Sequence, residues 1–262
     1  TARGAERPHP VRQQEWYRGI FRLLAIARRR FLLGRKGEKN MKKVLKLMLA
    51  LVMTCAIAGC SSSSKNDADV TITIGTSPDY APYESLNKKG EIVGFDVDMV
   101  KLFEGYLSDM EGKTYSLEFK QMDFDNIVTQ IQGDQIDLGI SGFTYSEDRV
   151  VEWSDPYLGT QQVAVVPNGS SITSNDQLVG KKLAAQTGAT GEQAAKEVEN
   201  AEVVSMKNVQ DIFNGLASNQ YDAAIVDLGV AQQYVSSGNF TQLNGSLMDE
   251  KNYVIAKKGN TK

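Results

Sequence analysis

The feature that most constrains the fold is a regular alternation, from residue 69 onward, of strand-like and helix-like segments. Residues 69–76 carry β-branched side chains at alternate positions, whereas residues 94–107 place Val97, Val100 and Phe103 on one helical face. The predicted strands are 69–76, 115–122, 136–142, 161–167, 182–188, 201–206, 222–227 and 252–258. The predicted helices are 94–107, 124–132, 190–200, 209–219 and 228–237. Such alternation predicts an α/β protein with largely parallel sheets.

Two segments of the chain echo each other. The sequences GDQIDLGISG and SNQYDAAIVD each follow an amphipathic helix, with Asp137 and Asp222 in the same place. Gly142 and Asp227 lie five residues after these aspartates. Ligands of open α/β sheets bind beyond the carboxyl ends of strands. We therefore expect two lobes of roughly 100 residues each, with Gly142–Thr144 and Asp227 facing a common cleft.

The first 69 residues differ from the rest in composition. Residues 1–40 hold nine of the ten arginines, and a lysine-tipped apolar run with small residues at its end begins at Met41. This run is typical of a secretory signal peptide. Because a signal peptide begins a protein, we interpret residues 1–40 as an upstream segment that is not part of the native protein; a basic cytoplasmic tail is the alternative.

The end of this apolar run, Ile57-Ala58-Gly59-Cys60, resembles the lipobox of bacterial lipoproteins. The resemblance implies a lipoprotein signal peptide at 41–59, a lipidated Cys60 and a flexible polar tether at 60–69. Acyl chains on one residue can hold a soluble domain to a bilayer. An ordinary signal peptide with an incidental cysteine is the alternative.

The composition after residue 59 excludes several functions. Residues 60–262 hold 14 lysines and one arginine against 29 acidic residues, a net charge of −14. Nucleic-acid binding needs clustered cations, so we expect none. No histidine follows residue 59 and Cys60 is the only cysteine there, which argues against histidine triads, most zinc sites and disulfides. We expect no metal site and no cofactor.

A few polar residues stand out as candidate ligands. Arg149 is the only arginine after Met41, and its guanidinium fork can hold a carboxylate with two bonds where lysine cannot. A surface pair with Glu147 or Asp148, or low arginine use in the genome, would explain it equally. Asp227, at the end of an apolar strand, either caps the next helix or receives a ligand cation.

Three further candidates lie beside turns. Thr190 follows Thr187-Gly188-Ala189 and is predicted to be the N-cap of the next helix, where free N–H groups attract an anion. Tyr80 and Phe124 stand beside turn residues and belong either to the core or to a ligand site.

Seven motifs in order resemble one protein family: GTSPDYAPYE, IVGFDVDMV, MDFDNIVTQIQ, DLGISGFTYSEDR, EWSDPY, AAQTGATGE and DAAIVD. They are similar to those of polar amino-acid-binding proteins of ABC importers, the solute-binding protein family 3, over residues 70–258. The resemblance implies a two-lobe type II periplasmic-binding-protein-like fold with two crossover strands. Lobe 1 comprises 70–156 and 250–262, lobe 2 comprises 157–249, and the hinge crossovers lie near 155–160 and 246–252.

The resemblance also implies roles for the candidate residues. Arg149 and Thr190 hold the α-carboxylate of a free L-amino acid, and Asp227 pairs with its α-ammonium. The Gly142 carbonyl and the Thr144 hydroxyl assist Asp227. Tyr80 and Phe124 flank the ligand side chain.

The sequence departs from the family in two respects. Relatives that bind cationic amino acids place an acid where this chain has Ser77, and some relatives have lysine at Gln186. These residues favour a polar, uncharged ligand such as glutamine, with arginine and cystine as alternatives. The family also continues after the last predicted strand with helices that complete lobe 1, so the resemblance implies that these C-terminal helices are missing from this sequence.

The function implied is that of a monomeric, lipid-anchored extracytoplasmic receptor and not an enzyme. It would deliver its amino acid to the permease and ATPase components of an ABC importer. The alternatives are a sensory domain of a longer signalling protein and a dehydratase of the same fold.

Overall fold

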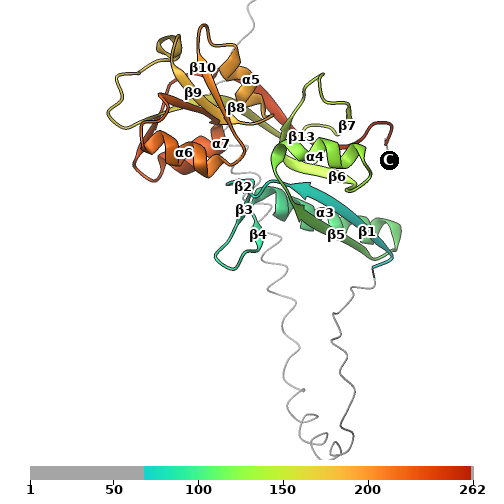
Figure 1. The fold of residues 1–262 in the computed structure, drawn as a ribbon. Helices are drawn as coiled ribbons and strands as arrows, with labels where there is room; N and C mark the ends of the chain where they lie inside the picture. The colour runs from blue at the N-terminus through green and yellow to red at the C-terminus, as the bar shows by residue number, and fades with distance from the viewer. Residues whose placement is uncertain (1–67, 261–262) are drawn as a thin grey trace, which may run out of the picture. The chain divides into compact units, whose positions relative to one another are not determined.

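The computed structural model describes residues 68–260, which lie within one compact unit of the chain (Figure 1). Its strands are β1 (Val70–Thr76), β2 (Asp79–Tyr80), β3 (Glu84–Leu86), β4 (Ile92–Val93), β5 (Tyr115–Gln121), β6 (Leu138–Thr144), β7 (Val151–Trp153), β8 (Leu158–Pro167), β9 (Lys182–Gln186), β10 (Glu202–Met206), β11 (Ala223–Asp227), β12 (Phe240–Gln242) and β13 (Met248–Lys257). The helices are α3 (Phe95–Glu111), α4 (Phe124–Gln132), α5 (Thr190–Lys196), α6 (Val209–Ala217) and α7 (Leu228–Val235), with a short 3-10 helix η1 (Asn175–Leu178). Each predicted element has a counterpart among them. The interpretations of 1–40, of the signal peptide and of Cys60 lie outside the described residues.

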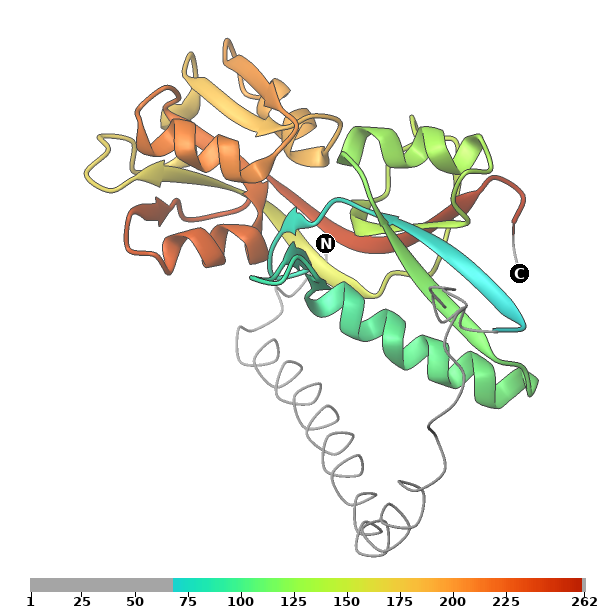
Figure 2. The ribbon, with the colours of Figure 1, turned by 60° about the horizontal axis from the view of Figure 1, so that its bottom comes forward.

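The main sheet has ten strands and consists of two parallel groups joined by an antiparallel pair (Figure 2). β1 pairs in parallel with β5 and β6, and β9 pairs in parallel with β10 and β11. Between the groups, β8 and β13 run antiparallel, with Met248 opposite Gln162 and Asn252 opposite Leu158. β13 then continues along β6, and β8 continues along β11. The two long strands therefore link the groups near the two predicted crossovers, while the lobe boundaries themselves remain a prediction.

The strands β8, β9 and β11 are largely buried on both faces. Val163 and Val165 of β8 pack in one apolar cluster with α6 and α7, whereas Ala164 and Val166 pack in a second cluster with α5. Alternate residues of a strand point to opposite faces, so helices on both sides bury nearly every side chain. The first group has its own apolar clusters, one around Phe143 and α4 and one around Val100 of α3.

The sequence echo corresponds to a repeated local structure. The Asp137 carboxylate accepts a hydrogen bond from the backbone N–H of Thr73 at 2.7 Å, and the Asp222 carboxylate accepts one from Lys182 at 2.8 Å. Each aspartate thus ties the start of its strand to the neighbouring parallel strand. The strands that follow, β6 and β11, end at Thr144 and Asp227. The two halves therefore aim equivalent strand ends at the candidate site.

One face of the first group carries an apolar hollow of about 540 Å³. Its lining includes Ile74, Ile140 and Val254 of the sheet and Phe103 of α3. Val100 and Phe103 both line this hollow and so share one face of α3, as predicted, although Val100 is 3% exposed and Phe103 is 47% exposed. Among residues 68–260, no helix has the length and apolar content needed to span a membrane.

Candidate functional site

A small cavity of about 10 Å³, enough for about one water molecule, lies at the strand ends that the echo singles out. Its lining residues are Tyr80, Phe124, Ser141, Gly142, Thr144, Arg149, Gln162, Gln186, Ala189 and Thr190. Seven of the nine candidate ligand residues are among them. The other two, Ser77 and Asp227, lie outside the lining. Residues from both parallel groups of the sheet therefore meet at this place.

Arg149 connects the two groups of the sheet. Its Nη1 donates to the Thr144 carbonyl at 2.6 Å, and its Nη2 donates to the Gly188 carbonyl at 2.7 Å. The guanidinium carbon lies 5.5 Å from the centroid of Phe124 and 5.3 Å from that of Phe143, distances at which a cation is attracted by a ring. Burial lowers the pKa of Arg149 to about 10, so the side chain stays charged at neutral pH. The side chain is thus a fixed cation in the cavity wall and not a surface arginine paired with Glu147 or Asp148.

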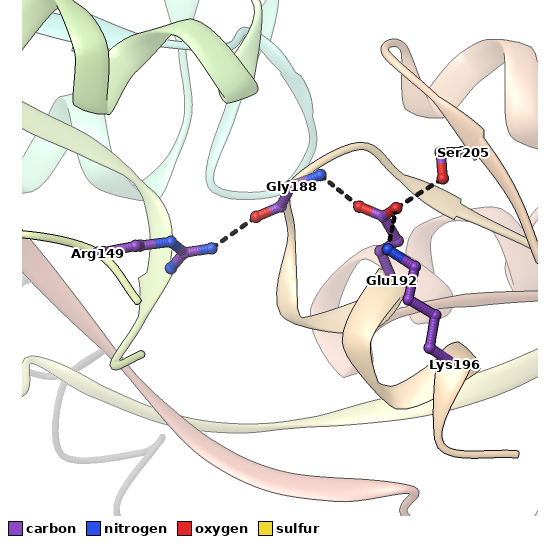
Figure 3. A network of polar contacts seen from close by, with 5 residues as sticks. All are labelled: Arg149, Gly188, Glu192, Lys196 and Ser205. Atoms are coloured by element: carbon purple, nitrogen blue, oxygen red, sulfur yellow. Dashed lines mark hydrogen bonds and ion pairs between the residues drawn. The ribbon is translucent and has the colours of Figure 1, made fainter. Parts of the chain in front are cut away.

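The turn that receives Arg149 is held in place by Glu192 (Figure 3). The Glu192 carboxylate accepts hydrogen bonds from the Gly188 backbone N–H at 2.7 Å, from Ser205 Oγ at 2.7 Å and from Lys196 Nζ at 2.6 Å. Gly188 has a φ of +74°, which favours glycine. The Gly188 carbonyl is therefore fixed in the direction of Arg149.

Thr190 lies at the start of α5 but is not its N-cap. The N-cap is Ala189, whose backbone is extended at φ −83° and ψ 162°, so the N-cap prediction for Thr190 is wrong. The Thr190 hydroxyl donates instead to Glu250 Oε2 at 2.8 Å. No local pattern in the sequence reveals this tertiary bond. Thr190 still places a hydroxyl and the helix N-terminus at the cavity.

Asp227 has the capping role that the sequence left open, while its role toward a ligand cation stays a prediction. It is the N-cap of α7, where its Oδ1 accepts from the Gly229 N–H at 2.8 Å and from the Tyr83 hydroxyl at 2.6 Å. Its Oδ2 accepts from the Thr160 hydroxyl at 2.7 Å. Burial raises the pKa of the carboxyl, while the hydrogen bonds from Tyr83 and Thr160 oppose that rise. A carboxylate has about four acceptor positions, so a further cationic donor can still be accommodated.

Four further candidates in the cavity lining are Tyr80, Gly142, Thr144 and Phe124. The Tyr80 hydroxyl accepts the backbone N–H of Asp227 at 3.3 Å. Gly142 has a φ of +59°, and a Cβ there would lie 3.5 Å from the Tyr80 ring, so glycine suits this position. The Thr144 hydroxyl is buried and has no hydrogen-bond partner among the described residues. Phe124 stacks on Phe143 with centroids 4.6 Å apart.

Asp79 lies beside two of the predicted site residues, Ser77 and Gln186. Asp79 Oδ1 accepts from the Ser77 hydroxyl at 2.8 Å, and its Oδ2 accepts from Gln186 Nε2 at 3.4 Å. The same Oδ2 accepts the backbone N–H of Val209, at the start of α6, at 2.7 Å. Burial raises the pKa of Asp79. Asp79 therefore stands between Ser77 and Gln186, a position that the sequence alone did not assign.

Glu250 is a residue of the site that the sequence analysis missed. It lies on β13, where Oε1 accepts from Gln162 Nε2 at 2.6 Å and Oε2 accepts from Thr190. Burial raises its pKa, and the nearby charge of Asp227 raises it further. No motif marks Glu250, because its partners lie 60 and 88 residues away in the sequence.

The charge balance of the region is strongly acidic. Arg149 is the only cationic side chain in the cavity lining. Asp79, Asp227 and Glu250 lie outside the lining, but each is hydrogen-bonded to a lining residue, namely Gln186, Tyr80 and Gln162. The arrangement offers one fixed cation with hydroxyl and N–H donors at one end and several carboxylates elsewhere. Such a site suits a small zwitterion, and the surplus of acids suits one that carries an extra positive charge. Within residues 68–260, no group of three or more histidine, cysteine or acidic side chains is arranged to hold a metal ion.

Comparison with known proteins gives a family match and close relatives. Residues 72–197 match the family model of bacterial extracellular solute-binding proteins, family 3. The chain is 33% identical over 210 residues to the arginine-binding extracellular protein ArtP of Bacillus subtilis (strain 168), covering 77% of this chain and 79% of that protein. It is 30% identical over 192 residues to the histidine-binding periplasmic protein of Escherichia coli (strain K12), covering 71% and 70% of the two chains.

Solved structures agree with this match. The arginine-bound form of a truncated ArgBP from T. maritima superposes with a TM-score of 0.68 at 32% identity, over 73% of this chain and 90% of that one. The predicted α/β fold of the type II periplasmic binding proteins is thereby confirmed.

Proposed function

Because the chain belongs to the bacterial extracellular solute-binding proteins of family 3, we propose that it closes around one free L-amino acid and delivers it to an ABC importer. Its relatives are extracellular or periplasmic binding proteins for amino acids and not enzymes. The chain is accordingly an amino-acid-binding protein, and the dehydratase alternative is set aside. The delivery step, the site residues and the ligand are the parts that we propose.

The position of Arg149 is the observation that carries the proposal. Its half-buried guanidinium lies against the rings of Phe124 and Phe143, and it reaches from one group of the sheet to the Gly188 turn of the other. An α-carboxylate entering beside Thr190 would meet this cation together with the free N–H groups at the start of α5. The α-ammonium would meet Asp227, helped by the Gly142 carbonyl and the Thr144 hydroxyl.

Matching both charges explains why binding would bring the two lobes together. A zwitterion loses several kcal/mol of hydration unless both of its charges find partners. Arg149 follows β6, whereas Asp227 and Thr190 belong to β11 and α5. Neither lobe supplies all the partners, so the ligand favours the conformation in which they are joined.

The surroundings of the side-chain end favour a basic amino acid such as L-arginine. Ser77 and Gln186 suit the amide of glutamine, but Asp79 lies within hydrogen-bond distance of both and adds a carboxylate that a guanidinium would pair with. Two named relatives, for arginine and for histidine, support this choice. Glutamine is the comparison ligand against which it is tested.

We also propose that lipidated Cys60 anchors the protein to the outer side of the cell membrane. The anchor is tested by replacing Cys60 with alanine and following the protein by cell fractionation. Release of the variant into the soluble fraction is expected, and membrane retention of the variant would contradict lipid anchoring.

Calorimetric titration of the purified protein with L-arginine, L-histidine, L-lysine and L-glutamine tests the ligand. We expect the basic amino acids to bind more tightly than glutamine. Tighter binding of glutamine would refute the basic preference while leaving amino-acid binding intact, and binding of no amino acid would refute the function itself.

A further inference from the structure

Glu250 occupies a place in the site that the proposed function leaves unused. It lies on β13, next to the β8 strand. Its carboxylate accepts a hydrogen bond from Gln162 Nε2 at 2.6 Å and one from the Thr190 hydroxyl at 2.8 Å. Gln162 and Thr190 both line the cavity and are 2% and 7% exposed. A carboxylate of the protein itself thus already takes the hydroxyl that we assign to the ligand's α-carboxylate.

A hydroxyl group has one proton to donate. When Thr190 donates to Glu250, it has no proton left for a second carboxylate, and the two carboxylates would repel each other across the short distance that the hydroxyl spans. Arg149 attracts both anions, but it has no ion pair within 4.0 Å among the described residues. Arg149 is therefore free to accept a ligand carboxylate, whereas Thr190 is shared.

We propose that Glu250 determines the affinity of the site for ligands with an α-carboxylate, because its own carboxylate competes with that of the ligand for the Thr190 hydroxyl. This inference rests on the proposed function. Glu250 acts as a positioning residue: it orients Thr190 and Gln162 and opposes the incoming carboxylate. The ligand gains the Thr190 hydroxyl only when Glu250 gives it up, by moving toward Gln162 or by taking up a proton.

Charged groups act on Glu250 in both directions: Asp227 favours its protonated form, and Arg149 favours its anion. The negative charge of Asp227 raises the pKa of Glu250. The Glu250 carboxylate in turn raises the pKa of Arg149 and of Tyr80. Gln162 on β8 and Thr190 on α5 do not titrate. A second carboxylate placed beside Thr190 adds a negative charge, which raises the pKa of Glu250 further. Binding of the ligand is then linked to uptake of a proton, and affinity increases as the pH falls.

The decisive experiment compares Glu250→Gln with the wild-type protein by calorimetry at pH 7.5. L-Arginine and L-argininamide, which lacks the carboxylate, serve as the two ligands. Glutamine at position 250 keeps the shape and an acceptor for Gln162 but carries no charge. We expect the variant to bind L-arginine about tenfold more tightly. L-argininamide has no carboxylate to compete, so its affinity should not increase.

The control is Asp249→Asn, since Asp249 is the exposed neighbour whose carboxylate accepts Ser246 Oγ at 2.8 Å. It should change the affinity for L-arginine by less than twofold. Equal or weaker binding of L-arginine to Glu250→Gln would overturn the inference.

Titration of the wild-type protein in two buffers of different ionisation enthalpy measures protons directly and does not depend on the variant folding. Uptake of protons on binding supports the inference, and binding without uptake, together with an unchanged affinity of Glu250→Gln for L-arginine, would overturn it. If the wild-type protein bound no amino acid, the proposed function would fail first, so the two failures are distinguishable.

Discussion

Replacing Arg149 with lysine keeps the positive charge but removes the fork. In the structure, Nη1 and Nη2 reach two carbonyls, those of Thr144 and Gly188, on opposite sides of the guanidinium. A lysine ammonium is a single point on a flexible stem and cannot hold two carbonyls and both oxygens of a carboxylate in a fixed plane. The variant therefore tests the geometry of the cation and not its charge.

The expected loss follows from the bonds that disappear. A hydrogen bond that involves a charged group contributes about 1.5–3 kcal/mol. Losing one such bond to the ligand weakens binding by about 10- to 150-fold, since each 1.4 kcal/mol is a factor of ten. Arg149→Ala leaves the ligand carboxylate without a cation in a buried site. Its cost is about 3–5 kcal/mol, so binding should fall below detection.

Calorimetric titration with the amino acid that binds the wild-type protein most tightly measures both variants. Thermal unfolding of each variant without ligand is the control, because a large drop in Tm would indicate a structural defect and not a lost contact. A dissociation constant for Arg149→Lys within about threefold of the wild-type value would refute the bidentate role of Arg149.

Three further predictions concern the acidic residues. Asp227→Asn keeps an acceptor for the Gly229 N–H but loses the charge, so all amino acids should bind about 10- to 150-fold more weakly by calorimetry; unchanged affinity would contradict the ammonium role. Asp79→Asn should weaken the binding of L-arginine about tenfold and that of L-glutamine less than twofold. An equal effect on the binding of both ligands would refute the preference of the site for basic amino acids. Burial raises the pKa of Asp96, in the first turn of α3, to about 6. Between about pH 4 and 6 this acid is therefore more protonated in the folded than in the unfolded chain. Its contribution to the free energy of unfolding, roughly 3 kcal/mol, is lost as the pH rises through this range. Tm should fall over this range, less steeply in Asp96→Asn than in the control Asp98→Asn on the exposed side of the same helix; identical slopes would contradict the assignment.

The sequence predicted the long elements because their periodicity is strong. Strands such as β11 and helices such as α4 start or end within a residue of the predicted positions. The strands β2, β3, β4, β7 and β12 were not predicted, since two or three residues carry no detectable period. β13 begins at Met248, four residues before the predicted start, because its polar first half pairs with β8 through backbone bonds that the side-chain pattern does not reveal.

The site was predictable where a motif or a strand end marks a residue. Arg149, Gly142, Thr144 and Thr190, which the family motifs mark, line one cavity, and their binding of a ligand stays a prediction. Glu250 was not predictable, because its role depends on the tertiary pairing of two distant strands. The N-cap at Ala189 was missed for the same reason: local patterns favour threonine, but a distant carboxylate takes the Thr190 hydroxyl.

A crystal structure of the protein with L-arginine would show whether an amino acid is held between Arg149 and Asp227. We expect the α-carboxylate to lie within hydrogen-bond distance of both Arg149 Nη atoms and the start of α5, with the α-ammonium against Asp227. A bound amino acid whose carboxylate lies away from Arg149 would contradict the proposed roles of both residues.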